Sequence, residues 1–302
     1  NQLGKRIMGL LKKLKRAVSK IFKPIVKIFT KVLGAIGGVF GFKPEVPDFN
    51  LGEGQTAEGQ VQGVLVNKTG ATNYIPVIYG TRMVGGSIIF VSTNGDSNKY
   101  LYVAMTLCEG QVPSDAIQKL LIEDHVMDIG TLTHGTQVSP NSADRYSGRC
   151  IFQFFDGRDN QVASDLLQNA PGWTDQHTLN GISYIACRFQ WDKITTQEQA
   201  DANPFKGGVP NIKVVMKGKK VYDATGLGST HTTAYADETT TYTNNPVSCL
   251  LDYMRNPRFG KGLGNEYFNW ADWNTAADVC NQNVTFTSGG ASEKPFTCDA
   301  VL

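Results

Sequence analysis

Hydrophobic residues near the beginning of the chain recur at alternating spacings of four and three. Such spacing places one continuous apolar seam along a helix, and lysines and arginines fill the other faces. Pro24 interrupts the pattern. Because an interior proline removes a backbone hydrogen bond, we expect two helical halves with a bend at 23–24. The seam consists of Ile7, Leu11, Leu14, Val18, Ile21, Ile25, Ile28 and Val32.

The charge of this leader, residues 1–43, differs from that of the remaining chain. It contains 11 of the 29 Lys and Arg residues and none of the 27 acids. A homomeric coiled coil needs acids to pair with its lysines, so the basic pattern favours an anionic membrane surface or an acidic protein groove. Packing within its own assembly is the simpler alternative. The apolar stretch 32–42 is too short to span a bilayer, which needs about 20 residues. The leader is not a secretory signal either, because its charges extend through its hydrophobic part.

From residue 61 the hydrophobic pattern changes to short β-type segments. Prolines at 44 and 47 end the leader, and residues 44–60 form a predicted linker. Segments such as KYLYVAMTL, RCIFQFF and ISYIACRFQW are rich in β-branched and aromatic residues and are separated by turn residues. Residues 93–96 predict a hairpin turn, and Gly218 marks a second reversal, between 214–216 and 221–222. Without βαβ alternation, we expect a mainly β fold with a few helices (α+β), built of linked antiparallel β domains over 61–245.

Three helices are expected in this body, at 163–168, from Pro246, and at 269–280. Asn245 is a suitable N-cap, Pro246 fits the first helical position, and Asn256 precedes a proline that ends the helix. Cys249, Leu250 and Tyr253 are predicted to share one face. Glycines at 260, 262 and 264 predict positive-φ turns. The polar segment 226–245 predicts an exposed loop or a β-hairpin arm.

The sequence matches none of the motifs considered for phosphate or metal binding. The Gly-Lys-Gly stretch at 260–262 lacks the spacing of a P-loop or a dinucleotide fingerprint, and a helix precedes it instead of a strand. The six cysteines include no CxxC pair, so we expect free, buried thiols and neither metal nor cofactor. A glycosidase-type alternative would need paired carboxylates, for which Glu109, Asp156 and Glu266 are the candidates.

The segments NNPVSCLLDYMRNPRFGKGLG, DVCNQNV and FTCDAVL carry a family resemblance. Together they resemble the tail-tip attachment protein of lambda-type bacteriophages, also called the host-specificity protein. The resemblance covers about residues 60–302 and is most specific near the C-terminus. If its three cysteines approach one another, we expect buried packing in preference to a disulfide or a metal site. The motif positions are Cys249, Leu250, Asp252, Asn256, Pro257, Arg258, Gly260, Cys280 and Cys298.

This resemblance implies a non-enzymatic structural hub at the tail tip of a virion, assembled in the host cytoplasm. The implied hub is a homotrimer that closes the tail tube, links it to receptor-binding parts and acts in host attachment and DNA delivery. Its implied partners are distal tail, tape-measure and fibre proteins, with DNA only in transit. The leader would contact the tape measure or the host membrane.

Under the same resemblance, residues 246–302 form a helix-turn-helix junction and the start of a further hub domain. The chain is then expected to be a piece of a longer protein. A tail-associated cell-wall hydrolase and a membrane-active polypeptide remain the alternative functions.

Overall fold

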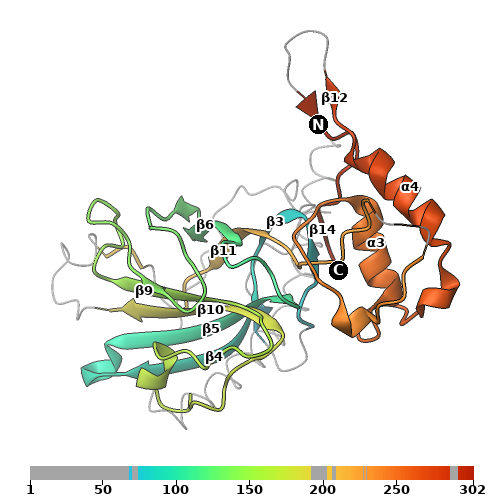
Figure 1. The fold of residues 1–302 in the computed structure, drawn as a ribbon. Helices are drawn as coiled ribbons and strands as arrows, with labels where there is room; N and C mark the ends of the chain where they lie inside the picture. The colour runs from blue at the N-terminus through green and yellow to red at the C-terminus, as the bar shows by residue number, and fades with distance from the viewer. Residues whose placement is uncertain are drawn as a thin grey trace, which may run out of the picture. The chain divides into compact units, whose positions relative to one another are not determined.

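The computed structural model describes residues 68–69, 74–191, 203–205, 209–226, 228, 230–285 and 292–302. All of them belong to one compact unit, Val61–Leu302. The predicted leader, the linker and the first predicted strand, at 61–66, lie outside the described residues. The described part is mainly β with two α-helices, which confirms the predicted fold class (Figure 1).

The larger sheet has six strands in the order β1-β4-β5-β10-β9-β8. Neighbouring strands are antiparallel except β1 and β4, which pair in parallel. The hairpin turn predicted at 93–96 is confirmed, because β4 and β5 are antiparallel neighbours on either side of it. The strands are β1 (Lys68–Thr69), β4 (Ser87–Asn94), β5 (Tyr100–Glu109), β8 (Gln137–Val138), β9 (Cys150–Asp156) and β10 (Ile182–Gln190).

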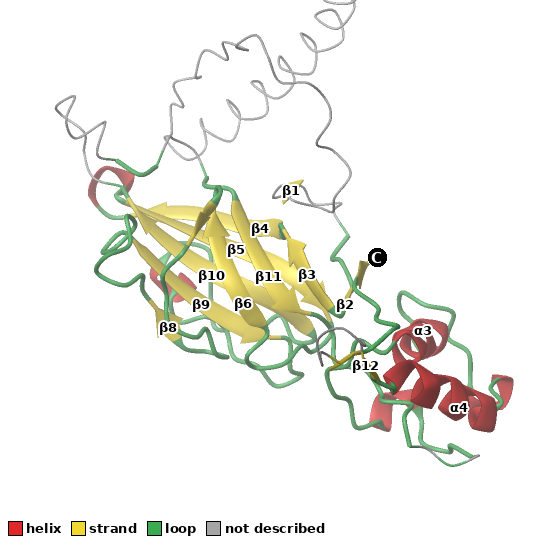
Figure 2. Ribbon diagram, turned by 90° about the horizontal axis from the view of Figure 1, so that it is seen from above, coloured by secondary structure: helices red, strands yellow, loops and turns green. Residues whose placement is uncertain are grey.

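A second sheet has four antiparallel strands in the order β3-β11-β6-β7 (Figure 2). Its strands are β3 (Thr81–Val84), β6 (Ile117–Ile122), β7 (His125–Val126) and β11 (Ile212–Lys217). Two short antiparallel pairs complete the strands. They are β2 (Ile78–Tyr79) with β14 (Ala300–Val301), and β12 (Val284–Thr285) with β13 (Ser292–Glu293).

Alternating side chains build two cores on the faces of the larger sheet. On one face, Val103 and Met105 of β5 pack in a cluster that also contains Val214 of β11 and Leu120 of β6, so this core joins the two sheets. On the other face, Tyr184 packs in a cluster closed by the segment 166–173. Both faces of the central strands are therefore buried.

Two α-helices lie side by side after the sheets (Figures 1 and 2). They are α3 (Pro246–Arg255) and α4 (Trp270–Asn281). Asn245 caps α3 as predicted, because its side chain accepts a hydrogen bond from the Val247 N–H. The Asn245 Nδ2 atom also donates to the Ala277 carbonyl of α4 at 2.9 Å. One residue thus starts the first helix and attaches it to the second.

The expected helix at 163–168 is wrong: only a 3₁₀ turn, Leu167–Asn169, forms there. The Ser164 hydroxyl accepts the Leu167 N–H at 3.2 Å, and the Asp165 carboxylate accepts the Leu166 N–H at 3.0 Å. Local side-chain bonds of this kind compete with a continuous helix.

The reversal predicted at Gly218 is also wrong, because the chain continues past β11 without a hairpin. The Gly218 N–H donates to the Gly80 carbonyl at 2.6 Å, and the Lys219 N–H donates to the Ile78 carbonyl at 2.7 Å. Val221 instead pairs with Thr241. Gly218 is required by close packing, since a Cβ there would meet the Ile78 carbonyl.

The segment 226–245 is a loop in its described residues and forms no hairpin arm. It contains one 3₁₀ turn, Tyr235–Asp237, and two of its side chains are buried, Glu238 beside Arg255 of α3 and His231 beside Trp270 of α4. The side chain of His231 is 9% exposed and that of Glu238 is 1% exposed. Most of the described residues of this segment are exposed, so the exposed loop of the two predicted alternatives is the one that forms, although these two polar side chains find partners inside the molecule.

Two local predictions near α3 also need correction. Of the three glycines expected at positive φ, only Gly262 has it, with φ +64°. Gly260 is needed for close packing instead, because a Cβ there would meet the carbonyl of Tyr253. Leu250 does not share the buried face of Cys249, since its side chain is 51% exposed.

Candidate functional site

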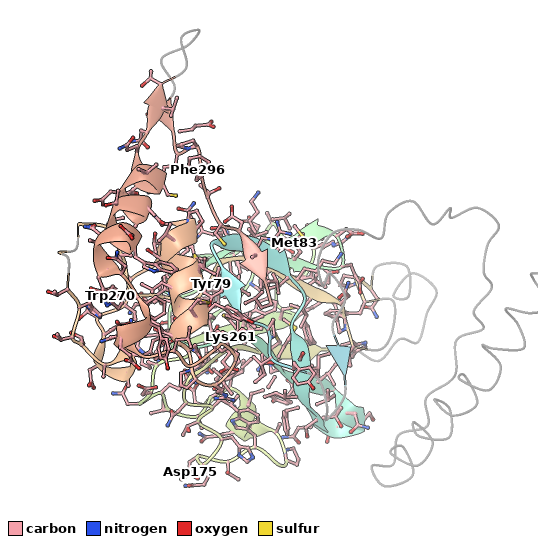
Figure 3. All side chains as sticks on the ribbon, turned by 90° about the vertical axis from the view of Figure 1, so that its right-hand side faces the viewer. Tyr79, Met83, Asp175, Lys261, Trp270 and Phe296 are labelled. Carbon is pink, nitrogen blue, oxygen red and sulfur yellow. The ribbon has the colours of Figure 1, made fainter. Side chains whose placement is uncertain are left out.

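The resemblance motif folds into a buried polar cluster on α3, which we call the polar junction. It comprises Tyr79, Lys219, Tyr235, Asp252 and Asn256. These residues come from β2, the segment directly after β11, the 226–245 loop and the C-terminal half and end of α3. Figure 3 labels Tyr79, which lies beside the ribbon of α3.

Asp252 lies at the centre of the polar junction and is 5% exposed. Its Oδ2 atom accepts the Tyr79 hydroxyl at 2.5 Å. Its Oδ1 atom accepts Lys219 Nζ at 2.6 Å and the Tyr235 hydroxyl at 2.7 Å. A buried carboxylate needs this many partners, because an unpaired buried charge is very costly. Asp252 thus joins three segments that are distant in the sequence.

The two tyrosines act as fixed donors. Burial, and next the neighbouring Asp252 carboxylate, raise the pKa of Tyr79 well above its ordinary value. The same causes, in the same order, raise the pKa of Tyr235. Both hydroxyls therefore stay protonated at neutral pH and donate to the carboxylate. This arrangement is suited to holding segments together, since every polar atom is already engaged.

Asn256 carries the polar junction into the turn after α3. Its Nδ2 atom donates to the Tyr235 hydroxyl at 2.8 Å, and its Oδ1 atom accepts the N–H groups of Arg258 at 2.8 Å and Phe259 at 3.2 Å. Arg258 Nε lies 3.1 Å from Glu109 of β5. Pro257 is exposed. The Asn-Pro-Arg-Phe-Gly turn is therefore a structural element that connects α3 with the larger sheet.

A second buried cluster surrounds Arg255, one turn from Asp252. Its guanidinium forms an ion pair with Glu238 and donates to Asn265 Oδ1 at 2.7 Å. It also lies over the Trp270 ring, 5.2 Å from the centroid. His231 Nε2 lies 2.7 Å from Glu238 Oε1. This cluster attaches the 226–245 loop to both helices.

All six cysteines are free thiols. Burial raises the pKa of Cys108 and Cys150 to about 12, so both are inert core residues. Cys298 packs against the buried cluster that contains Cys249, whose thiol donates to the Thr243 carbonyl at 3.9 Å. Cys280 lies elsewhere, in a shallow apolar groove beside α4 that Phe296 also lines.

The structure thus gathers part of the motif. Cys249, Asp252, Asn256 and Cys298 lie at or beside the polar junction, whereas Leu250 and Cys280 face other surroundings. The leader positions, from Ile7 to Val32, lie outside the described residues.

The sequence analysis missed the partners Tyr79, Lys219, Tyr235 and Glu238. Tyr79 and Asp252 are 173 positions apart, and no local pattern links them. The available signal was the presence of Asp252 and Arg255 on the apolar face of a short helix, which indicates buried charges with partners elsewhere.

The three acids of the hydrolase alternative do not form a carboxylate pair. Glu109 is opposite Ile182 and Asp156 is opposite Ser183, so their side chains point to opposite faces of the sheet. Arg158 contacts Asp156 through two bonds of 3.0 and 2.7 Å. Glu266 is exposed on a different element.

Within the described ranges, no three His, Cys, Asp or Glu side chains are grouped closely enough to hold a metal ion. The helices found in those same ranges are all too short or too polar to cross a bilayer.

The chain forms a β-rich module, and the buried polar groups of its motif connect packed segments. Comparison with known proteins also indicates a structural protein. The chain is similar to the baseplate hub protein pb3 of Escherichia phage T5, with 24% identity over 246 residues. This similarity covers 66% of the chain and 24% of that protein, so the chain spans about a quarter of its relative. It supports a structural phage tail or baseplate protein located in the virion, without singling out the lambda type.

Comparisons with solved structures and with family models add little to this assignment. Among solved structures, a chain from the virion of a native gene transfer agent particle aligns with 76% of this chain and 47% of its own length. The sequence identity is 15% and the TM-score is 0.34. No family model matches the chain.

Proposed function

We propose that this chain is a central hub protein of a phage tail tip, a homotrimer that closes the tail tube and connects it to receptor-binding parts. The observation that carries the proposal is the similarity to a baseplate hub protein over 66% of the chain. The lambda-type motif supports it, because Asp252 and Asn256 of that motif have structural roles in the polar junction.

Location in the particle tests this proposal directly. Antibodies against the chain, applied to intact virions and imaged by electron microscopy, are expected to label the tail tip. Labelling of the capsid or the tail shaft would contradict a hub. Native mass spectrometry of detergent-released tips tests the stoichiometry. Three copies per tip are expected, and any other copy number contradicts the homotrimer.

The leader is proposed to act in DNA delivery, by contacting the tape-measure protein or the host membrane. Its basic flanks and apolar seam support this role. Deleting residues 1–42 should leave assembled particles that adsorb to cells but deliver DNA poorly. A matched variant with Ile7, Ile21 and Ile28 changed to Ser keeps the charge and removes the seam, so it should share the defect. Normal infection by both particles would refute the role.

A further inference from the structure

We propose that Cys249 and Cys298 form a disulfide when the protein meets an oxidising environment, which links α3 covalently to the segment that leads into the C-terminal strand β14. Cys249 is a buried member of a small cluster with Tyr79 and Val221, and Cys298 packs against this cluster, next to the polar junction. Cys249 is buried, whereas Cys298 is partly open to solvent.

The surrounding backbone holds the two residues in place. Cys249 lies in the first half of α3 and is 2% exposed. The Cys298 N–H donates to the Asn244 carbonyl at 2.7 Å, directly before the start of α3. Two residues later, β14 pairs with β2. Both ends of the new bond would therefore start from positions that the fold already brings together.

A disulfide requires a sulfur–sulfur distance of about 2.05 Å, so the two packed thiols need to move together. Cys249 is fixed by its helix, but Cys298 lies in the irregular segment between β13 and β14. The residues from Lys294 to Thr297 are exposed or only partly buried, so this segment has room to adjust. The movement is then borne mainly by the partly exposed partner.

The reaction needs an oxidant, for which oxidised glutathione serves as the small-molecule disulfide. The Cys298 thiolate attacks one glutathione sulfur, and the first glutathione leaves as a thiolate. The Cys249 thiolate then attacks the Cys298 sulfur of this mixed disulfide and releases the second glutathione. Two protein thiols are oxidised to one disulfide, and one oxidised glutathione is reduced to two thiols. Exposure sets the order, because Cys298 is the more accessible thiol of the pair.

The chemistry also explains why the bond would form late. Burial, and next the neighbouring thiol, raise the pKa of Cys249, and burial raises the pKa of Cys298. Little thiolate is then present at neutral pH, so exchange is slow. The timing rests on the proposed function: a virion protein folds in a reducing cytoplasm and is later released into oxidising surroundings.

The test is peptide mapping of the purified full chain after incubation with oxidised glutathione under native conditions. Free thiols are blocked with N-ethylmaleimide before non-reducing digestion and mass spectrometry. A peptide that links Cys249 to Cys298 is expected, together with four remaining thiols. The oxidised chain should also melt about 5 °C or more above the reduced chain. A Cys280→Ser control should keep both effects, and Cys298→Ser should abolish them.

Three outcomes would overturn the proposal: six thiols after prolonged oxidation, a stable glutathione adduct on Cys298, or a link between any other pair. The wild-type map is decisive even if a cysteine variant fails to fold. The result is also independent of the hub proposal, since oxidation of the isolated chain is measured without virions.

Discussion

Replacing Asp252 by Asn removes one negative charge from the polar junction with almost no change of shape. The carboxylate is 5% exposed and accepts Tyr79, Lys219 and Tyr235 at 2.5 to 2.7 Å. In the variant, the buried Lys219 ammonium, 9% exposed as a residue, loses its counter-charge. The substitution therefore isolates the electrostatic contribution of the junction from its packing.

The expected loss is about 3 kcal/mol of unfolding free energy. Two unit charges about 4 Å apart interact by about 4 kcal/mol at an effective dielectric constant of about 20. The amide that replaces the carboxylate keeps one acceptor oxygen, which recovers part of this energy. Breaking one partner of a buried ion pair typically costs about 3–5 kcal/mol, in agreement with the estimate. Since domains are stable by only about 5–15 kcal/mol, the loss is readily measurable.

Equilibrium urea unfolding, followed by the fluorescence of the four tryptophans, measures this loss. Asp175→Asn is the matched control, because Asp175 is exposed and bonds only with its neighbour Gln176 in the described structure. The control should change stability by less than about 0.5 kcal/mol. If Asp252→Asn costs no more than the control, the polar junction is not a stabilising ion pair and the reasoning is refuted.

Adding Lys219→Met to Asp252→Asn should recover roughly half of the lost free energy. The double variant buries no uncompensated charge, whereas either single variant does. The coupling between the two positions is read from a double-mutant cycle in the same urea assay. Strictly additive losses would show that the two charges do not interact.

Three further predictions concern the helix start, the turn glycine and the acid limit of stability. Asn245→Ala should cost about 1–2 kcal/mol in urea unfolding, because it removes a helix cap. Asn269→Ala should cost less than about 0.5 kcal/mol, since the Asn269 side chain accepts no N–H of α4 and donates only to the exposed Asp272 carboxylate. Equal losses would contradict this. Gly260→Ala should cost more than about 2 kcal/mol of unfolding free energy, because the added Cβ meets the Tyr253 carbonyl of α3. Gly130→Ala should be nearly neutral, since its Cβ makes only an ordinary contact with Val138. The reverse order of the two losses would refute the packing argument. Burial alone would raise the pKa of Asp144, but hydrogen bonds from two backbone N–H groups and a histidine lower it overall. The Asp144 carboxylate therefore contributes stability above about pH 4, and this contribution is lost as the pH falls through its lower folded pKa. The melting temperature of Asp144→Asn should accordingly depend less on acid pH than that of the wild type. An unchanged pH profile would contradict the prediction.

Local signals in the sequence were sufficient for the elements whose causes are local. The Asn-Pro pair at 245 and 246 placed the start of α3, and the turn residues at 93–96 placed the hairpin of β4 and β5. Strand registers and sheet order were not predictable, because they depend on pairing between distant segments. Gly218 illustrates this point, because a glycine is needed there for close packing against Ile78 and not for a reversal of the chain.

The candidate site divides in the same way. Asp252 and Asn256 were found through the motif, and their structural role follows from their buried partners. Lys219 and Tyr235 were missed because nothing near either residue in the sequence marks it as a partner of α3. Leu250 is exposed although the sequence placed it on one helix face with Cys249, because helical periodicity groups residues but the neighbouring elements decide which of them are covered.

The geometry of the polar junction indicates that it specifies the orientation of α3 as well as its stability. An apolar contact would tolerate some rotation of the helix, whereas the Asp252 carboxylate satisfies donors from β2, the segment after β11 and the 226–245 loop in one orientation only. Stability and orientation should therefore separate in the Asp252→Asn, Lys219→Met double variant. Part of the unfolding free energy returns there, but amide hydrogen exchange in α3 should stay faster than in the wild type. If exchange slows in proportion to the recovered free energy, the junction contributes stability alone and does not select the orientation.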